Sequence, residues 1–153
     1  MAKQWPVAVK EVFLHFSDSP GKGIRRFSAQ TATMREIQEY HMDSHGWSDI
    51  GYHFVVFQRQ GVIPIARVFA GRPINFVPAA QDNHNTNTIA ICVVMQPGER
   101  FKPSTQRRIK SLLRKLKRDI GHGFVVRPHS AVVDTDCPGT EIRTWIRTLP
   151  KPF

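Results

Sequence analysis

Two residues with metal-binding side chains stand close together near the end of the chain, in the segment 127–139 (RPHSAVVDTDCPG). His129 and Cys137 are eight positions apart, and a Pro-Gly pair follows the cysteine. Imidazole nitrogen and cysteine thiolate are both good ligands for zinc. The segment therefore has two interpretations: a turn that happens to contain a thiol, or two ligands of a metal site whose third ligand lies elsewhere.

A third ligand matters because catalytic zinc sites use three protein ligands and keep the fourth position for water. His15 is the best candidate, since it ends the apolar run VFL just before a Pro/Gly break. A histidine at a strand end is also common as a purely structural residue. The other cysteine, Cys92, lies within TIAICVVM and is expected in the core. On these residues alone, zinc chemistry is suggested and not established.

The bulk composition limits the classes of protein that this chain can be. Its 153 residues, 41% of them hydrophobic, fit one domain with a real core. No apolar run approaches the roughly 18 residues of a membrane span, and the N-terminal residues lack a secretory signal pattern. Two cysteines cannot form a disulfide framework. The net charge of +10 favours a polyanionic partner, which can be nucleic acid, anionic lipid or an acidic cell wall.

The elements that must position these residues can be read from apolar periodicity. We expect buried strands at 10–17 and 88–95, a short strand at 123–128, and a hairpin over 51–69 that turns at 58–61. Pro64 places the second hairpin strand at an edge or a bulge. A long loop rich in Asn and Pro follows up to residue 87, and loops of that length are often functional.

Three helices are expected between and after the strands. The first, at 33–46, has a capping box in Thr33 and Glu36 and a C-terminal stop at Gly46. The second, at 103–121, has one apolar face, and its basic residues fall mostly on the other side. That basic side is either a solvated surface or a surface that attracts a polyanion. The third, at 139–149, closes the chain.

Strands that alternate with helices predict the α/β class, with a central mixed sheet flanked by helices. We find no internal repeat and no linker. The expected organisation is a single domain over 1–153, with its core at about 11–147.

Several separate motifs resemble one family, the zinc-dependent N-acetylmuramoyl-L-alanine amidases, which include phage lysozyme-amidases and peptidoglycan recognition proteins. The segment 35–56 (REIQEYHMDSHGWSDIGYHFVV) resembles the family's helix end followed by Gly-Trp-x-Asp-Ile-Gly-Tyr-His-Phe. AGRP, HNTNTIAI and HSAVVDTDCPG resemble three further family segments, in the family's order.

The resemblance implies the amidase fold and roles for individual residues. It makes His15, His129 and Cys137 the ligands of one zinc ion. It makes Tyr52 the catalytic tyrosine, which would hold the attacking water or stabilise the oxyanion. Thr135 stands where phage members often have lysine, so it can donate a hydrogen bond but adds no positive charge.

Further positions are expected near the substrate. His41 and Trp47 either line a substrate groove or pack the helix end, and Arg72 and Asn85 are candidates to bind the stem peptide. His53 is interpreted as structural because it should face away from Tyr52. Two departures from the family pattern stand out: Gln81 replaces a histidine, whose contact is lost or replaced, and Ala90 replaces a glycine.

The function that the resemblance implies is hydrolysis of the bond between N-acetylmuramic acid and L-alanine in bacterial peptidoglycan. A short basic domain without a signal resembles a phage endolysin, which is made in the host cytoplasm and reaches the wall after the membrane is permeabilised. We expect a monomer. The alternatives are a non-catalytic peptidoglycan-binding module, against which Cys137 and Tyr52 argue, and secondary nucleic-acid binding by the basic helix, which would leave the site motifs unexplained.

Overall fold

The computed structural model describes residues 8–19, 21, 24, 26–58 and 65–153. Five strands form one sheet in the order β3-β2-β4-β1-β5. In chain order the strands are β1 (Glu11–Phe16), β2 (Phe54–Phe57), β3 (Arg67–Ala70), β4 (Thr88–Val94) and β5 (Val125–Pro128). The helices are α1 (Phe27–His45), α2 (Pro103–Ile120) and α3 (Thr140–Ile146), with a short 3-10 turn, η1 (His129–Ala131), after β5.

The sheet is mixed, as predicted from the sequence. β4 lies at its centre and pairs in parallel with β1 and β2, β5 pairs in parallel with β1, and β3 runs antiparallel to β2. Every residue of β4 is buried, which a continuous apolar run predicts for a strand covered on both faces. The pairing sets His15 beside Cys92 and Leu14 beside Pro128.

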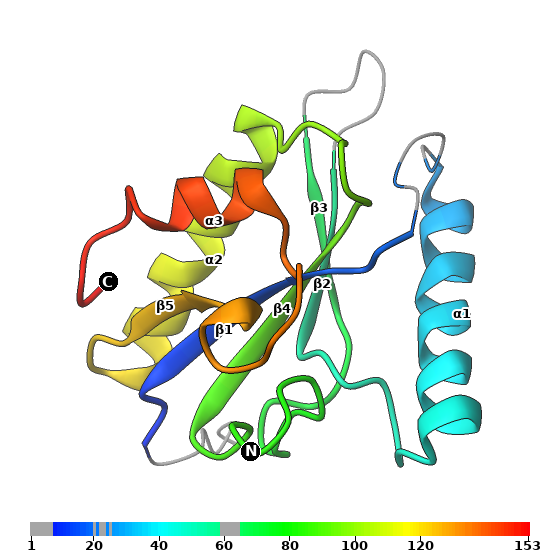
Figure 1. The fold of residues 1–153 in the computed structure, drawn as a ribbon, viewed down its shortest axis with the longest axis horizontal. Coiled ribbons are helices and arrows are strands. Elements are labelled where there is room, and N and C mark those ends of the chain that lie inside the picture. The colour runs from blue at the N-terminus through cyan, green and yellow to red at the C-terminus, as the bar shows by residue number, and fades with distance from the viewer. Residues whose placement is uncertain (1–7, 20, 22–23, 25, 59–64) are drawn as a thin grey trace.

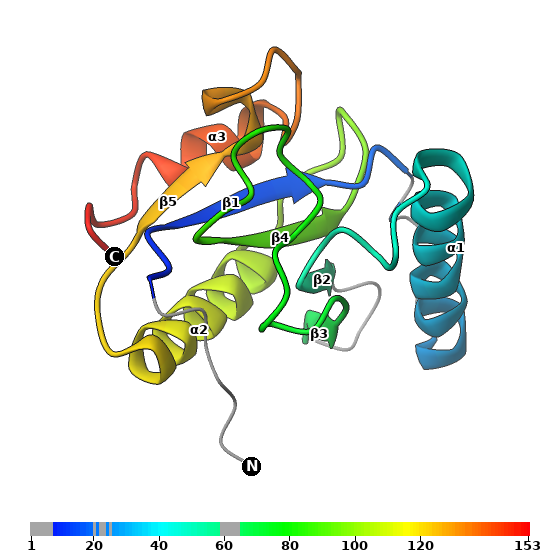
Figure 2. The same ribbon diagram turned by 90° about the horizontal axis from the view of Figure 1, so that it is seen from below.

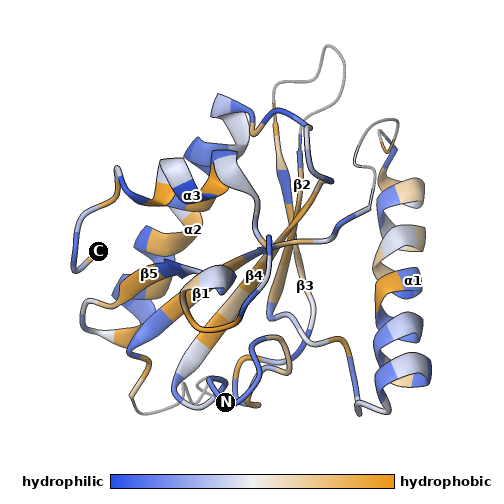
Figure 3. Ribbon diagram, in the orientation of Figure 1, coloured by the Kyte–Doolittle hydropathy of each residue, from blue (hydrophilic) through white to orange (hydrophobic). Residues whose placement is uncertain are grey.

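Helices cover both faces of the sheet (Figure 1). α2 and α3 lie on one side, where Ile109, Leu113 and Ile142 join the larger apolar core. α1 lies on the other side, where Met34 and Ile37 pack on a smaller core that includes Cys92. Figure 2 shows the two long helices apart, with the strands between them. Hydrophobic residues predominate in the strands, whereas hydrophobic and hydrophilic residues alternate along the helices (Figure 3).

The predicted elements are confirmed within one to three residues at most ends, but the start of α1 is wrong. The helix begins at Phe27, six residues before Thr33, and Thr33 bonds back to the Ala29 carbonyl at 3.1 Å instead of capping the helix. No side chain caps this N-terminus, and Phe27 in the first turn, although 63% exposed, stacks on Phe69 of β3 with ring centroids 5.5 Å apart. Gly46 does end α1, in the left-handed conformation.

The hairpin of β2 and β3 is confirmed, and β3 is an edge strand. Residues 59–64, with most of the predicted turn and Pro64, lie outside the described residues. Within the described ranges, no helix is both long and apolar enough to cross a lipid bilayer.

Candidate zinc site and substrate groove

Three side chains from distant parts of the sequence meet at one end of the sheet. His15 is in β1, His129 begins η1 directly after β5, and Cys137 lies in the loop before α3. Their ligand atoms all lie within 4.8 Å of one another. Nδ1 of His15 is 3.8 Å from Sγ of Cys137, and the two imidazole centroids are 4.5 Å apart.

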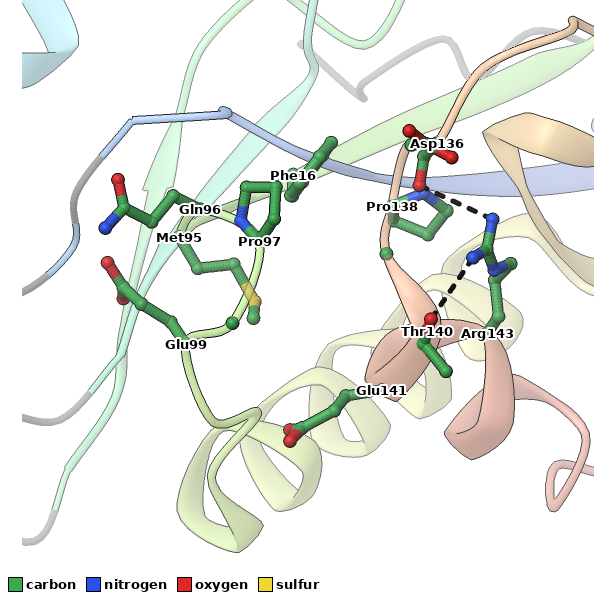
Figure 4. Close-up of a pocket in the computed structure, with 12 residues that line it drawn as sticks. Phe16, Met95, Gln96, Pro97, Glu99, Asp136, Pro138, Thr140, Glu141 and Arg143 are labelled. Carbon is green, nitrogen blue, oxygen red and sulfur yellow. Dashed lines mark hydrogen bonds between the residues drawn. The ribbon is translucent and has the colours of Figure 1, made fainter.

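The fold explains why these residues converge. β1 and β5 are parallel neighbours, so the segments that follow them leave the sheet at the same edge. The loop then closes through a hydrogen bond of 3.0 Å from Ser130 N–H to the Cys137 carbonyl. Arg143 of α3 holds the same loop from outside by donating to the Asp136 carbonyl, and it also donates to the hydroxyl of Thr140 in its own helix (Figure 4).

The protonation states suit a metal. Burial, followed by the nearby His129, lowers the pKa of His15 to about 3, and burial also lowers the pKa of His129. Both rings are therefore neutral at pH 7 and have a free lone pair. Burial raises the pKa of the Cys137 thiol to about 12, against the opposing effect of a hydrogen bond from Phe16 N–H. The thiol must therefore lose its proton when a metal binds.

The donor set fits zinc. Bonds of about 2.0–2.3 Å to nitrogen and sulfur in a tetrahedron place the ligand atoms roughly 3.5 Å apart. The His15–Cys137 separation of 3.8 Å is close to that value. Among the residues that the structure describes, the cluster contains three ligand candidates, two with nitrogen and one with sulfur, and three protein ligands are the pattern of catalytic zinc sites.

Tyr52, the expected catalytic tyrosine, lies beside this cluster just before β2. Its ring centroid is 5.3 Å from that of His15 and 5.2 Å from that of His41. Burial raises the pKa of Tyr52 well above its usual value, and Cys92 and Cys137 add to that effect. The hydroxyl is therefore protonated at neutral pH and can donate a hydrogen bond.

A cavity of about 370 Å³ opens beside Tyr52, between the part of α1 from Thr33 to His45 and the loops that face it. His41 and Trp47 both line it, so the structure places these two predicted residues at a groove. Nδ1 of His41 accepts a hydrogen bond of 3.0 Å from Gly51 N–H, and its pKa is lowered to about 4, chiefly by burial. Trp47 stacks on His45 with centroids 4.6 Å apart.

The other predicted contacts are held by the protein itself. Arg72 donates hydrogen bonds to the Ile50 carbonyl and the Ser48 hydroxyl. The side-chain oxygen of Asn85 accepts the N–H groups of Ala80 and Gln81, at 3.1 and 3.0 Å. The Thr135 hydroxyl accepts from Cys137 N–H at 3.2 Å. Contacts of these side chains with substrate stay predictions.

Gln81 is a site residue whose role sequence reasoning missed. It is fully buried, and its Oε1 lies 3.1 Å from Nε2 of His15, 66 positions earlier in the chain. The only signal in the sequence was that a glutamine occupies a position where the family has histidine. The contact that was expected to be lost or replaced is thus made by an amide.

A second cavity of about 370 Å³ lies on the other side of the Cys137 loop (Figure 4). Phe16, Met95, Pro138 and Arg143 are among its lining residues, and none of the three metal-ligand candidates is. Phe16 follows His15 in β1, so its side chain points to the opposite face of the sheet. This cavity therefore opens on the face of the sheet opposite the His15 side chain, although Asp136 and Pro138, on either side of Cys137, line it.

Known proteins share both the sequence pattern and the fold. The model of the N-acetylmuramoyl-L-alanine amidase family matches residues 6–140. The endolysin of Klebsiella phage KP32 is 31% identical over 128 residues, which are 77% of this chain and 80% of that protein. An N-acetylmuramoyl-L-alanine amidase of Sus scrofa is 27% identical over 92% of this chain, and the match spans only 23% of that longer protein.

Among solved structures, peptidoglycan recognition protein-1 of Manduca sexta superimposes with a TM-score of 0.78 at 26% identity. The superposition covers 93% of this chain and 78% of that one. The family match spans most of the sequence, including the three clustered ligand candidates. The chain therefore belongs to the N-acetylmuramoyl-L-alanine amidase family.

Proposed function

We propose that the protein is a zinc-dependent amidase that hydrolyses the bond between N-acetylmuramic acid and L-alanine in bacterial peptidoglycan. The observation that carries this proposal is the cluster of His15, His129 and Cys137 beside Tyr52 and an open groove. The family match and the similarity to a phage endolysin support the same activity.

Each residue of the site has a defined task in this proposal. His15, His129 and Cys137 would hold one zinc ion, which supplies a Lewis acid and an activated water when bound. Tyr52 would donate its hydroxyl proton in a hydrogen bond to the oxygen that gains negative charge in the transition state. The Thr135 hydroxyl accepts a hydrogen bond from the backbone N–H of Cys137 and would help to orient that residue. Thr135 is also the second candidate to donate a hydrogen bond to the same oxygen.

The groove residues would bind and orient the substrate. Because Nδ1 of His41 accepts from Gly51, the neutral ring carries its proton on Nε2, which leaves that N–H available to a ligand carbonyl. Trp47 offers an aromatic surface on the same wall. Arg72 and Asn85 are proposed to contact the stem peptide through side-chain N–H groups that are not used in their hydrogen bonds within the protein.

We further propose that the protein acts as a monomeric phage endolysin, which works at the wall of the host once the membrane is permeabilised. The relatives named endolysins in Klebsiella phage KP32 and Escherichia phage T7 support this assignment. The exposed basic side of α2 would hold the enzyme near anionic wall components.

The test uses purified peptidoglycan. The protein should release new L-alanine amino termini without new reducing sugar ends. Chelation should abolish that release, added zinc should restore it, and Cys137→Ala should be inactive with or without zinc. Full activity after chelation, or in Cys137→Ala, would exclude the zinc mechanism. Binding of peptidoglycan with no cleavage in the presence of zinc would identify the protein as a binding module instead.

A further inference from the structure

A line of buried polar groups leads from the long loop to His15. Gln81 contributes Oε1 toward Nε2 of His15, at 3.1 Å. The other end of its amide, Nε2, donates to Oγ1 of Thr88 at 2.7 Å. The Thr88 hydroxyl in turn donates to the backbone carbonyl of Asn85, also at 2.7 Å. Gln81 is 0% exposed, Thr88 is 4% exposed and His15 is 1% exposed.

The direction of every hydrogen bond in this line follows from its last member. A backbone carbonyl only accepts, so the single hydroxyl proton of Thr88 is directed to Asn85. Thr88 then has only a lone pair for Gln81, which must present its NH₂ group there. The carbonyl oxygen of the Gln81 amide is thereby turned to His15, and this contact requires a proton on Nε2 of the imidazole.

A neutral imidazole has one proton, so Nδ1 of His15 keeps the free lone pair. Nδ1 is the atom that lies 3.8 Å from Sγ of Cys137, inside the cluster. Asn85 also holds the backbone at Gln81 in place, because its side-chain oxygen accepts the Ala80 and Gln81 N–H groups.

We propose that Gln81 is a positioning residue that, oriented by Thr88 and the Asn85 carbonyl, locks His15 in the tautomer protonated at Nε2 and so selects Nδ1 as the metal ligand. This inference rests on the proposed zinc site. Partners of this kind orient metal-bound histidines in proteins generally, and their loss costs about 10–100-fold in metal affinity. Here the side-chain amide of Gln81 is that partner. The Asn85 carbonyl, two hydrogen bonds from His15's own partner, fixes which end of the amide faces the imidazole.

Thr88→Val is the sharpest test, because it leaves His15 and Gln81 in place and removes only the group that orients the amide. Without the hydroxyl, the amide can turn its NH₂ group toward His15, which favours a proton on Nδ1. Nitrogen NMR of the metal-free protein at pH 7 should show neutral His15 with its single proton on Nε2 in the wild type, and a mixture of the Nε2-protonated and Nδ1-protonated tautomers in Thr88→Val. The zinc dissociation constant, measured by competition with a chromogenic chelator, should rise about 10–100-fold.

Three further variants separate positioning from general destabilisation. Gln81→Leu should weaken zinc binding as Thr88→Val does, whereas Gln81→Glu, which keeps an oxygen toward His15, should retain the Nε2 proton. Thr105→Val makes the same chemical change at a buried threonine that bonds Gln58, far from the cluster, and should bind zinc like the wild type.

A wild-type His15 protonated at Nδ1 would overturn the inference, as would unchanged zinc affinity in Thr88→Val or an equal loss in Thr105→Val. The proposed function is tested separately. An enzyme that cleaves peptidoglycan while Thr88→Val behaves like wild type contradicts only the positioning role. A protein that binds zinc through Nδ1 of His15 and cleaves nothing contradicts only the amidase activity.

Discussion

The backbone N–H of Phe16 donates a hydrogen bond of 3.4 Å to Sγ of Cys137, 121 positions later in the chain. The last residue of β1 thus supports one ligand candidate while its neighbour His15 supplies another. A donor aimed at sulfur favours the thiolate, but burial has the larger effect and raises the pKa of Cys137 to about 12. The sulfur is therefore a thiol in the metal-free protein and is preorganised to become a thiolate.

Zinc binding at pH 7 should consequently release about one proton from Cys137, while His15 and His129, already neutral, release none. Calorimetric titration in buffers of different ionisation enthalpy measures this number. Cys137→Asp, whose carboxylate is ionised beforehand, should bind zinc more weakly and release about one proton fewer. Cys92→Ser, a change at the buried cysteine outside the cluster, should match the wild type. Equal proton release from Cys137→Asp and wild type would contradict the assignment of Cys137 as a ligand.

Tyr52→Phe should lower kcat about 10²–10³-fold, as loss of one oxyanion donor does in other hydrolases, and leave zinc affinity unchanged. The reason is that the Tyr52 ring lies beside that of His15, whereas its neutral phenol is not one of the three proposed zinc ligands. A soluble muropeptide substrate separates kcat from wall binding. Tyr40→Phe is the matched control, because Tyr40 lines the same groove but its side chain is 59% exposed. Equal kcat values in the two variants would remove Tyr52 from the proposed mechanism.

His53 gives a prediction for stability against pH. Its Nδ1 accepts Ala90 N–H at 3.1 Å, its Nε2 lies 2.9 Å from the Phe76 carbonyl, and its pKa is lowered to about 4, chiefly by burial. Protonation at Nδ1 would break this hydrogen bond, because the new N–H of His53 would point at the N–H of Ala90. Below pH 6.5, His53 in the unfolded chain becomes protonated, whereas His53 in the folded protein stays neutral down to about pH 4. The free energy of unfolding should therefore fall between pH 6.5 and 4, by about 3 kcal/mol from this residue.

Urea unfolding in the presence of a chelator measures that contribution. His53→Gln can make both hydrogen bonds with an amide that does not titrate, so its unfolding free energy should depend less on pH over the same range. His15 and His41 also have lowered pKa values, but they are present in both proteins and cancel in the difference. Parallel pH profiles for wild type and His53→Gln would show that the His53 pKa is not lowered.

Most of the strands and helices could be predicted from the sequence, because a segment with a strongly periodic apolar pattern can bury its apolar residues in only one way. The apolar face of α2 and the continuous run of β4 each specify their own burial. The start of α1 was missed because no side chain caps it, and the ring that its first turn contacts, Phe69, is far away in sequence. The same reason hid Gln81: its role exists only where the long loop returns to β1, and no local pattern marks such a contact. The family motifs predicted that the three ligand candidates form one site. The parallel pairing of β1 with β5 explains why the segments that carry His15 and His129 meet at one edge of the sheet.

The basic surface of α2 yields the last prediction. Arg107, Arg114 and Arg118 are seven and four positions apart, so they form one exposed stripe along the helix. Within the described part of the chain, Lys115 pairs with Asp119, and no ion pair involves these three arginines. Such a stripe attracts polyanions through charge alone, because the apolar side of α2 is already buried in the core.

Replacing all three arginines by glutamine should weaken sedimentation with whole cell walls at low salt and reduce the salt dependence of that binding. Cleavage of a small uncharged muropeptide should keep its wild-type rate, since the stripe lies on the helix that covers the face of the sheet opposite α1 and its groove. The triple replacement by lysine preserves the charge and should bind walls like the wild type. If the glutamine variant sediments unchanged at low salt, the basic side of α2 is a solvated surface, and the net charge has no part in wall attachment.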